Sequence, residues 1–270
     1  MRSYLTILLL LFKITFVFCQ NYSLNDFKES SIPDIYSSDW HELNSATDKE
    51  FIFSVCSGKI KIEKFYDNSD FQYQFANGTL IAINMGEFGG GLYYKPLDTS
   101  SFKKLFVNGK DVKSIRQTFF GGLLAPPKNP INEVIKNAYL LQSGTFKFIF
   151  LLNDKLYLMS GLSHMDITFG DLFTIRAIKD SFFISHALHI DDSPEAMTVY
   201  KSKIFIATAK GFYILDKNLN KEKIFENLFW YGLYPTSVVV LDEENIYVTI
   251  RGGYAKLNAI KKEIKFFKAK

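Results

Sequence analysis

The stretch that decides the fold is the last third of the chain, because it contains one pattern twice. Residues 194–216 read PEAMTVYKSKIFIATAKGFYILD, and residues 235–258 read PTSVVVLDEENIYVTIRGGYAKLN. The leading prolines are 41 positions apart, and the strand cores IFI (204–206) and IYV (246–248) are 42 apart. A repeat of about 40–45 residues made of short strands is typical of one blade of a β-propeller.

Each copy divides into four short strands, which we name A to D from the centre of a propeller outward. In the first copy they are EAMTV, KIFIAT, GFYILD and KEKIF, and in the second TSVVV, IYVTI, GYAKL and EIKFF. Weaker copies cover residues 71–107, with FKKLFVN as strand D, and residues 144–184. A single blade cannot bury both of its faces, whereas blades stacked radially cover one another.

The rest of the chain is expected to complete this fold. FIFSVC and KIKIEKF, joined at Ser57-Gly58, predict a hairpin. INEVIKNAYLL (131–141) has a helix-like spacing, so residues 112–142 are either a degenerate blade or an inserted helix. We therefore predict an all-β chain folded as a β-propeller of about six four-stranded blades, with five or seven as alternatives. A lead-in at residues 20–35, which could supply a closing strand, precedes a single domain at residues 36–270.

The first nineteen residues are predicted to be a signal peptide. Arg2 precedes the apolar run LTILLLLFKITFVF, and cleavage near Cys19-Gln20 puts Val17 at the −3 position. A membrane anchor is disfavoured because the run is short and Lys13 interrupts it. A lipidated Cys19 is disfavoured because bulky Phe18 precedes it. We expect a secreted, periplasmic or cell-envelope protein with no transmembrane segment in the mature chain.

The net charge and the cysteine content argue against a nucleic-acid-binding protein and against a fold stabilised by internal disulfides. The formal charge of +4 falls to +2 when Arg2 and Lys13 are removed, which gives no electrostatic basis for binding nucleic acid. Cys56 is the only cysteine of the mature chain, so it cannot form an internal disulfide. The fold must therefore be stabilised by burial alone.

The connections between strands predict one functional face. The B–C turns are short at residues 209–210 and 251–252, but expand to Met85–Gly90 and Gly161–Phe169. In a propeller these turns open on the same face as the D–A connections, here Ser185–Ser193 and Asn227–Tyr234. We expect the following residues to share that face around the mouth of a central channel: Glu87, His164, Asp166, His186, His189, Asp191, Asp192, Trp230, Tyr231, Tyr234 and Arg251.

Seven of these residues are candidates for binding a ligand: Glu87, His164, Asp166, Trp230, Tyr231, Tyr234 and Arg251. The aromatic rings are suited to stacking on a sugar or peptide, although packing between blades explains them equally well. Glu87 sits in a glycine-rich turn, where a solvated side chain is the simpler interpretation. His164 and Asp166 have the chemistry of a base and its orienting carboxylate.

His186, His189 and Asp191 form a candidate metal site. Imidazole and carboxylate groups bind Zn²⁺, and carboxylates bind Ca²⁺. His-x-x-His without a fixed third ligand is a weak pattern, and ordinary surface histidines are the alternative explanation.

The two C-terminal copies resemble the blades of exported bacterial β-propellers of the NHL-like and YWTD-like kinds. The resemblance implies a fold and carries no catalytic residue, since one fold hosts many functions. We expect an exported binding module for a protein, peptide or glycan. A hydrolase or lyase that uses a metal at the channel mouth is the alternative.

Overall fold

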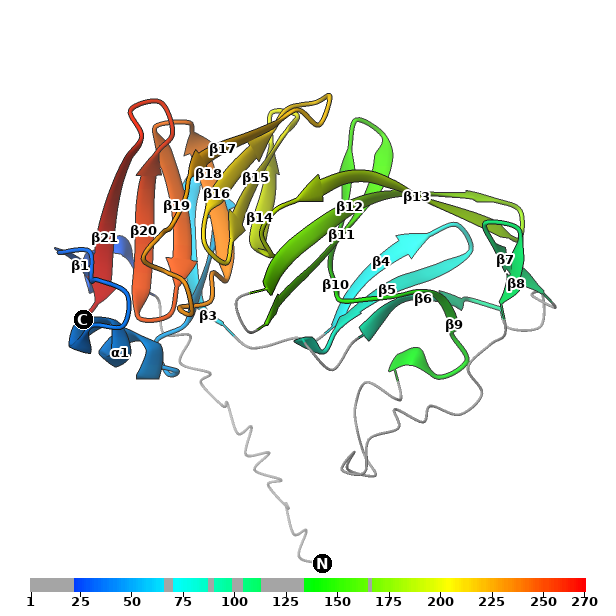
Figure 1. Ribbon diagram of the computed structural model, residues 1–270, viewed down its shortest axis with the longest axis horizontal. Helices are drawn as coiled ribbons and strands as arrows, with labels where there is room; N and C mark the ends of the chain where they lie inside the picture. The colour runs from blue at the N-terminus through cyan, green and yellow to red at the C-terminus, as the bar shows by residue number, and fades with distance from the viewer. Residues whose placement is uncertain (1–21, 66–69, 87–89, 99–103, 113–133, 165–166) are drawn as a thin grey trace, which may run out of the picture.

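The computed structural model describes residues 22–65, 70–86, 90–98, 104–112, 134–164 and 167–270. The predicted signal peptide lies outside these residues. The described chain is all-β and forms five sheets (Figure 1). Its short helices are η1 (Leu24–Asp26) and α1 (Ser38–Ser45) near the N-terminus. Within the described ranges, no helix has the length and apolar character needed to cross a bilayer.

The two C-terminal copies form two neighbouring antiparallel sheets (Figure 1). The first contains β14 (Pro194–Tyr200), β15 (Lys203–Thr208), β16 (Phe212–Leu215) and β17 (Lys221–Phe225). The second contains β18 (Ser237–Asp242), β19 (Asn245–Ile250), β20 (Gly253–Asn258) and β21 (Glu263–Ala269). All eight strands expected in this part of the chain are therefore present. The lead-in adds β1 (Phe27–Ser30) to the outer edge of β21, with Phe27 opposite Ala269.

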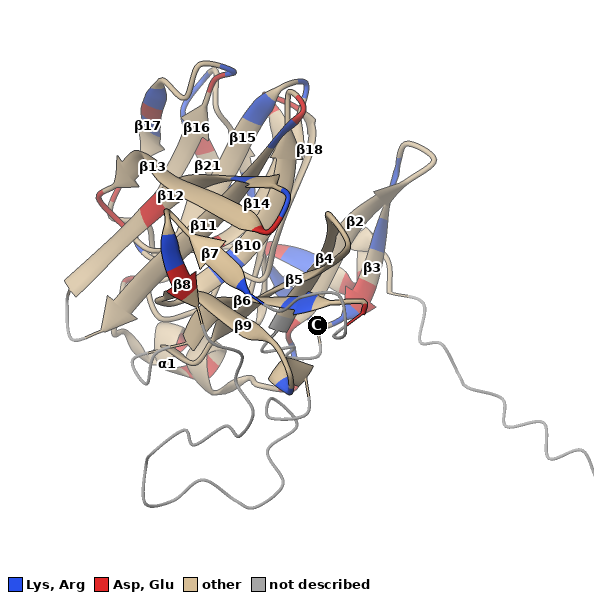
Figure 2. Cartoon of the chain, turned by 90° about the vertical axis from the view of Figure 1, so that its right-hand side faces the viewer, with Lys and Arg blue, Asp and Glu red and all other residues tan. Residues whose placement is uncertain are grey.

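Strand β15 shows why these sheets stack. Its side chains alternate between two cores: Phe205 and Ala207 join the core shared with β18–β20, while Ile204 and Ile206 join the core shared with β10–β12. Both faces of the strand are thus covered by other sheets, which explains its continuous apolar sequence. Strand β17, at the outer edge, is partly exposed and carries charged residues. Figure 2 shows charges on the outer strands β3, β8 and β17 as well.

The third sheet corrects two predictions. It contains β10 (Phe146–Leu152), β11 (Lys155–His164), β12 (Ile167–Ile178) and β13 (Ser181–Ile190). Residues 161–169 are not an expanded loop, because β11 and β12 stay paired as far as His164 opposite Ile167. Most of the expected 185–193 connection likewise belongs to β13. Glycines in both strands, which look like loop residues in the sequence, pair at Gly161–Gly170 and make room for Pro194.

The fourth sheet contains β4 (Asp70–Phe75), β5 (Gly78–Asn84), β6 (Gly90–Pro96) and β9 (Tyr139–Ser143). The prediction that FKKLFVN supplies strand D of this sheet was wrong. The strand in that segment, β7 (Leu105–Val107), pairs with β13 and with β8 (Lys110–Val112) instead. Its place beside β6 is taken by β9, from the segment with helix-like spacing. Tyr139 and Leu141 enter one core and Leu140 another, so from residue 139 the burial has a period of two.

The fifth sheet is the predicted hairpin of β2 (Phe51–Cys56) and β3 (Lys59–Lys64). Ser57 and Gly58 both have positive φ (52° and 74°), as a two-residue hairpin turn requires. The hairpin prediction is thus confirmed, and the sheet has these two strands.

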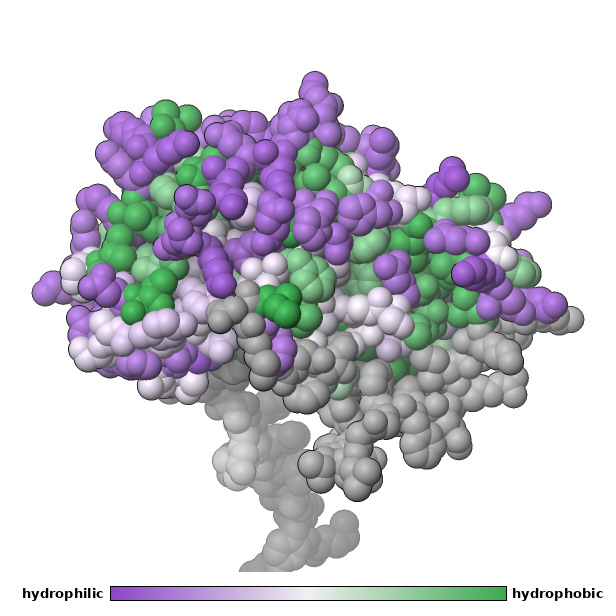
Figure 3. Space-filling model, viewed as in Figure 1, coloured by the Kyte–Doolittle hydropathy of each residue, from purple (hydrophilic) through white to green (hydrophobic). Residues whose placement is uncertain are grey.

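The first strands of the five sheets follow one another in space. Strand β2 contacts β18, β18 contacts β14, β14 contacts β10, and β10 contacts β4 (Figures 1 and 2). Within the described residues five sheets are present, against the six expected, and no closed barrel or propeller is identified. On the face shown in Figure 3, polar side chains cover β14–β17, and apolar ones gather over β12 and β13.

Candidate functional site

A cleft of about 970 Å³ lies where the first strands of the sheets begin. Strands of four sheets line it through residues such as Ile52, Phe71, Phe148 and Met197, and the sheet of β18–β21 contributes residues of its turns and connections, such as Thr236. We call it the central cleft. Its volume is at the upper end of the range usual for small-ligand sites, about 300–1,000 Å³.

One wall of the central cleft is an ion pair between Arg251 and Glu50. The Arg251 Nε donates to Glu50 Oε1 at 2.5 Å, and its Nη1 donates to the carbonyl oxygen of Asn44 at 2.9 Å. Arg251 lies in the β19–β20 turn, while Asn44 belongs to α1 and Glu50 directly precedes β2. The pair is largely shielded from water, with side-chain exposures of 19% and 16%, so it fixes the position of Arg251 firmly.

Tyr234 stands over this pair. Its ring centroid is 4.6 Å from Arg251 Cζ, so the guanidinium covers one ring face, while the residue remains 55% exposed. Its φ of 50° is unusual for a bulky residue, and the following Pro235 restricts it further. Such strain occurs preferentially at functional sites, so Tyr234 is the first residue we assign to a candidate site.

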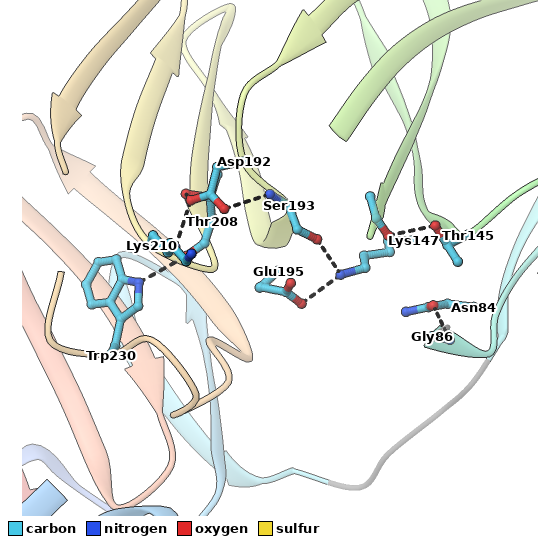
Figure 4. Close-up of polar contacts among 11 residues, drawn as sticks. Asn84, Gly86, Thr145, Lys147, Asp192, Ser193, Glu195, Thr208, Lys210 and Trp230 are labelled. Atoms are coloured by element: carbon cyan, nitrogen blue, oxygen red, sulfur yellow. Dashed lines mark hydrogen bonds and ion pairs between the residues drawn. The ribbon is translucent and has the colours of Figure 1, made fainter. Parts of the chain in front are cut away.

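A second ion pair that lines the central cleft joins Lys147 of β10 and Glu195 of β14. The Lys147 Nζ donates to Glu195 Oε2 at 2.7 Å and to Ser193 Oγ at 3.1 Å (Figure 4). Asn84, at the end of β5, lies on the other side of Lys147 and accepts a hydrogen bond from the Gly86 amide through Oδ1. The pair thus joins two neighbouring sheets at the rim of the cleft.

Asp192 fixes the start of β14 through hydrogen bonds to its side chain. Its side chain is buried and accepts hydrogen bonds from the Ser193 amide, the Thr208 hydroxyl and the Lys210 amide at 2.8, 2.5 and 2.7 Å. These bonds tie the β13–β14 connection to the β15–β16 turn (Figure 4). Asp192 was expected at the channel mouth, but it is buried and not among the residues that line the cleft, so its three hydrogen bonds give it a structural role.

Trp230 is fully buried and is not an exposed platform. Its indole Nε1 donates to the Thr208 carbonyl oxygen at 3.0 Å, and its ring packs in the core between the two C-terminal sheets. Of the two interpretations offered for the aromatic residues, packing between sheets is therefore the one that applies to Trp230. Tyr231 is half-buried, with the Lys210 Nζ 4.7 Å from its ring centroid.

Of the ligand-binding candidates that the structure describes, His164, Trp230 and Tyr231 are not among the residues that line the central cleft. His164 ends the β11–β12 hairpin opposite Ile167, away from the cleft residues. Glu87 and Asp166 lie outside the described residues, although Met85 and Gly86, just before Glu87, do line the cleft. Of the seven candidates, the structure brings Tyr234 and Arg251 together.

The candidate metal residues are only partly grouped. His186 Nε2 and His189 Nδ1 both lie within hydrogen-bond distance of Asp171 Oδ1, at 3.0 and 2.9 Å. Asp191 is directed elsewhere and pairs with Lys221 Nζ at 2.7 Å. Across the described part of the chain, no group of three His, Cys, Asp or Glu residues is arranged to hold a metal ion.

Asp171 is electrostatically distinct in this histidine pair. Partial burial raises the pKa of its carboxyl, but the hydrogen bonds from His189 and His186 outweigh burial and leave the pKa below its usual value. The carboxylate is therefore the acceptor that orients both imidazoles, a role that requires no metal.

Sequence reasoning missed Glu50, Lys147, Glu195 and Asn84, which complete the walls of the central cleft. Three of them share a feature that is visible in the sequence: Glu50, Lys147 and Glu195 are polar residues at or next to the start of an otherwise apolar strand A. In this chain, all three of these positions line the central cleft.

Comparisons with protein-family models and with curated proteins give no match for this chain. The case for its function therefore rests on the geometry of the site.

Proposed function

We propose that this chain is an exported binding module that holds a protein, peptide or glycan ligand in the central cleft. The observation that carries the proposal is Tyr234: an exposed ring in a left-handed backbone conformation, supported on one face by Arg251 and open to a cleft lined by strands or turns of all five sheets.

The same proposal extends to the fold. The chain of contacts from β2 through β18, β14 and β10 to β4 is what five blades of a propeller would make around a shared axis. We propose five blades, of which the first, β2–β3, is reduced to a hairpin. The strand starts would then surround the channel mouth, where a ligand touches several blades at once.

Binding is favoured over catalysis because the charged groups of the cleft are engaged with one another. Arg251 is paired with Glu50, and Lys147 with Glu195. A general base must be free to approach and take a proton from a substrate, whereas each carboxylate of this cleft is already bound to a neighbouring cation. A metal-assisted hydrolase or lyase remains the alternative, and elemental analysis of the purified protein decides it.

The test is a binding screen on the mature chain, residues 20–270, against glycan and peptide libraries. Tyr234→Ala should weaken any ligand found at the cleft at least tenfold. Tyr36→Ala is the matched control, because Tyr36 is also exposed (62%) and also has positive φ (66°), but lies beside α1 outside the cleft.

Three outcomes would count against the proposal. A ligand that both tyrosine variants bind equally well would place the site elsewhere. If no member of either library binds, the proposal of a binding module fails. Stoichiometric calcium or zinc, together with hydrolysis abolished by a chelator, would support the enzyme.

A further inference from the structure

The central cleft contains equal numbers of positive and negative groups. Within the described residues, its charged lining consists of two cations, Lys147 and Arg251, and two carboxylates, Glu50 and Glu195. Each cation lies within 2.7 Å of a carboxylate oxygen, and the side chains are 11–21% exposed. An ionic ligand would therefore meet both signs of charge at each pair and gain no net attraction, unless it displaced one member and left the other desolvated and unpaired.

The pairs nevertheless leave polar atoms for a ligand. Glu195 bonds through Oε2 and Glu50 through Oε1, while Arg251 uses Nε and Nη1 and Asn84 uses Oδ1. No hydrogen bond inside the described chain occupies the second carboxylate oxygens, the Arg251 Nη2 or the Asn84 Nδ2. The cleft thus presents two acceptors and two donors that are held in fixed positions by their own partners.

This combination matches one ligand chemistry. A sugar hydroxyl both donates and accepts, so it can bond to a carboxylate oxygen and to a guanidinium or amide N–H without adding charge. The apolar C–H face of a pyranose ring can lie on the open face of Tyr234, whose other face is covered by Arg251. We infer that the ligand of the central cleft is a neutral glycan, an inference that rests on the binding function proposed above.

The test titrates the mature protein with neutral di- and trisaccharides of glucose, galactose, mannose and N-acetylglucosamine. The same panel is repeated with uronic-acid and amino-sugar counterparts and with a peptide library. Neutral sugars should bind better than their charged counterparts. Their affinity should change less than twofold between 50 and 500 mM salt, because no net charge is neutralised on binding.

Glu195→Gln supplies the sharper comparison. It removes the negative partner of Lys147 and gives the cleft a net positive charge, while keeping the shape of the side chain. The ratio of affinities for a uronic-acid disaccharide and its neutral parent should rise about tenfold. Glu243→Gln is the matched control, because Glu243 pairs with Lys203 at 2.6 Å outside the cleft, and it should leave the ratio unchanged.

The outcomes separate this inference from the proposed function. A charged glycan or a peptide that binds best, and that depends on Tyr234, overturns the neutral-glycan inference and keeps the binding module. The inference is also overturned if the ratio of affinities for the uronic-acid disaccharide and its neutral parent is the same in Glu195→Gln and in Glu243→Gln. If no sugar and no peptide binds, both the inference and the proposed function fail.

Discussion

Replacing Asp192 with Ala tests how the wall of the cleft is held. The change removes an acceptor of three hydrogen bonds and leaves two buried donors, the Ser193 amide and the Thr208 hydroxyl, without an acceptor. The Thr208 oxygen keeps the hydrogen bond that it accepts from the Gly211 amide. The Lys210 amide, which is only half-buried, can turn to water. Each buried donor left unsatisfied costs about 1–3 kcal/mol, so Asp192→Ala should lower the free energy of unfolding by about 4 kcal/mol.

Urea unfolding of the mature chain measures this loss. Trp40 and Trp230, the only two tryptophans, are both buried, and their fluorescence reports the transition. Asp216→Ala is the control, because Asp216 also accepts three hydrogen bonds, but in a solvent-exposed turn where water can replace it. If Asp192→Ala lost no more stability than Asp216→Ala, burial would not be the cause and our account of the wall would be wrong.

Three further predictions concern pH and packing. The two histidine partners of Asp171 lower its pKa, so the stability that it contributes is present above its unfolded pKa and is lost as the pH falls through its folded pKa. Acid titrations of wild type and Asp171→Asn should therefore converge only below that folded pKa, which is lower than the usual value of about 3.9. Burial raises the pKa of Tyr254 to about 12. The free energy of unfolding of wild type should therefore fall by about 3 kcal/mol between pH 10 and pH 12, whereas that of Tyr254→Phe should not show this fall in alkaline unfolding. Gly170→Ala would place a methyl group against the ring of Pro194 and should lower the free energy of unfolding by about 1–3 kcal/mol, as measured by urea unfolding. An unchanged urea midpoint would show that β14 can shift to accommodate the methyl group.

The candidate site was only partly predictable from the sequence. Strand order indicated that turns and connections from different sheets would meet, and Tyr234 and Arg251 do meet at the central cleft. The sequence could not distinguish Tyr234 from Trp230, since both are aromatic residues in one connection. Their surroundings differ: Trp230 packs between two sheets, whereas Tyr234 has a left-handed backbone conformation and is 55% exposed.

Local pattern was sufficient where each strand pairs with its neighbour in the chain. Alternating apolar residues and short turns determined the strands of the last two sheets and the β2–β3 hairpin, because antiparallel neighbours need only a tight turn to pair. Long-range pairing was decided by the tertiary structure alone. The placement of β9 beside β6, of β7 beside β13 and of β1 beside β21 depends on which sheet edge is free and which core needs covering. The ion pairs that line the cleft join residues far apart in sequence, and only the packing of whole sheets brings them within reach of each other.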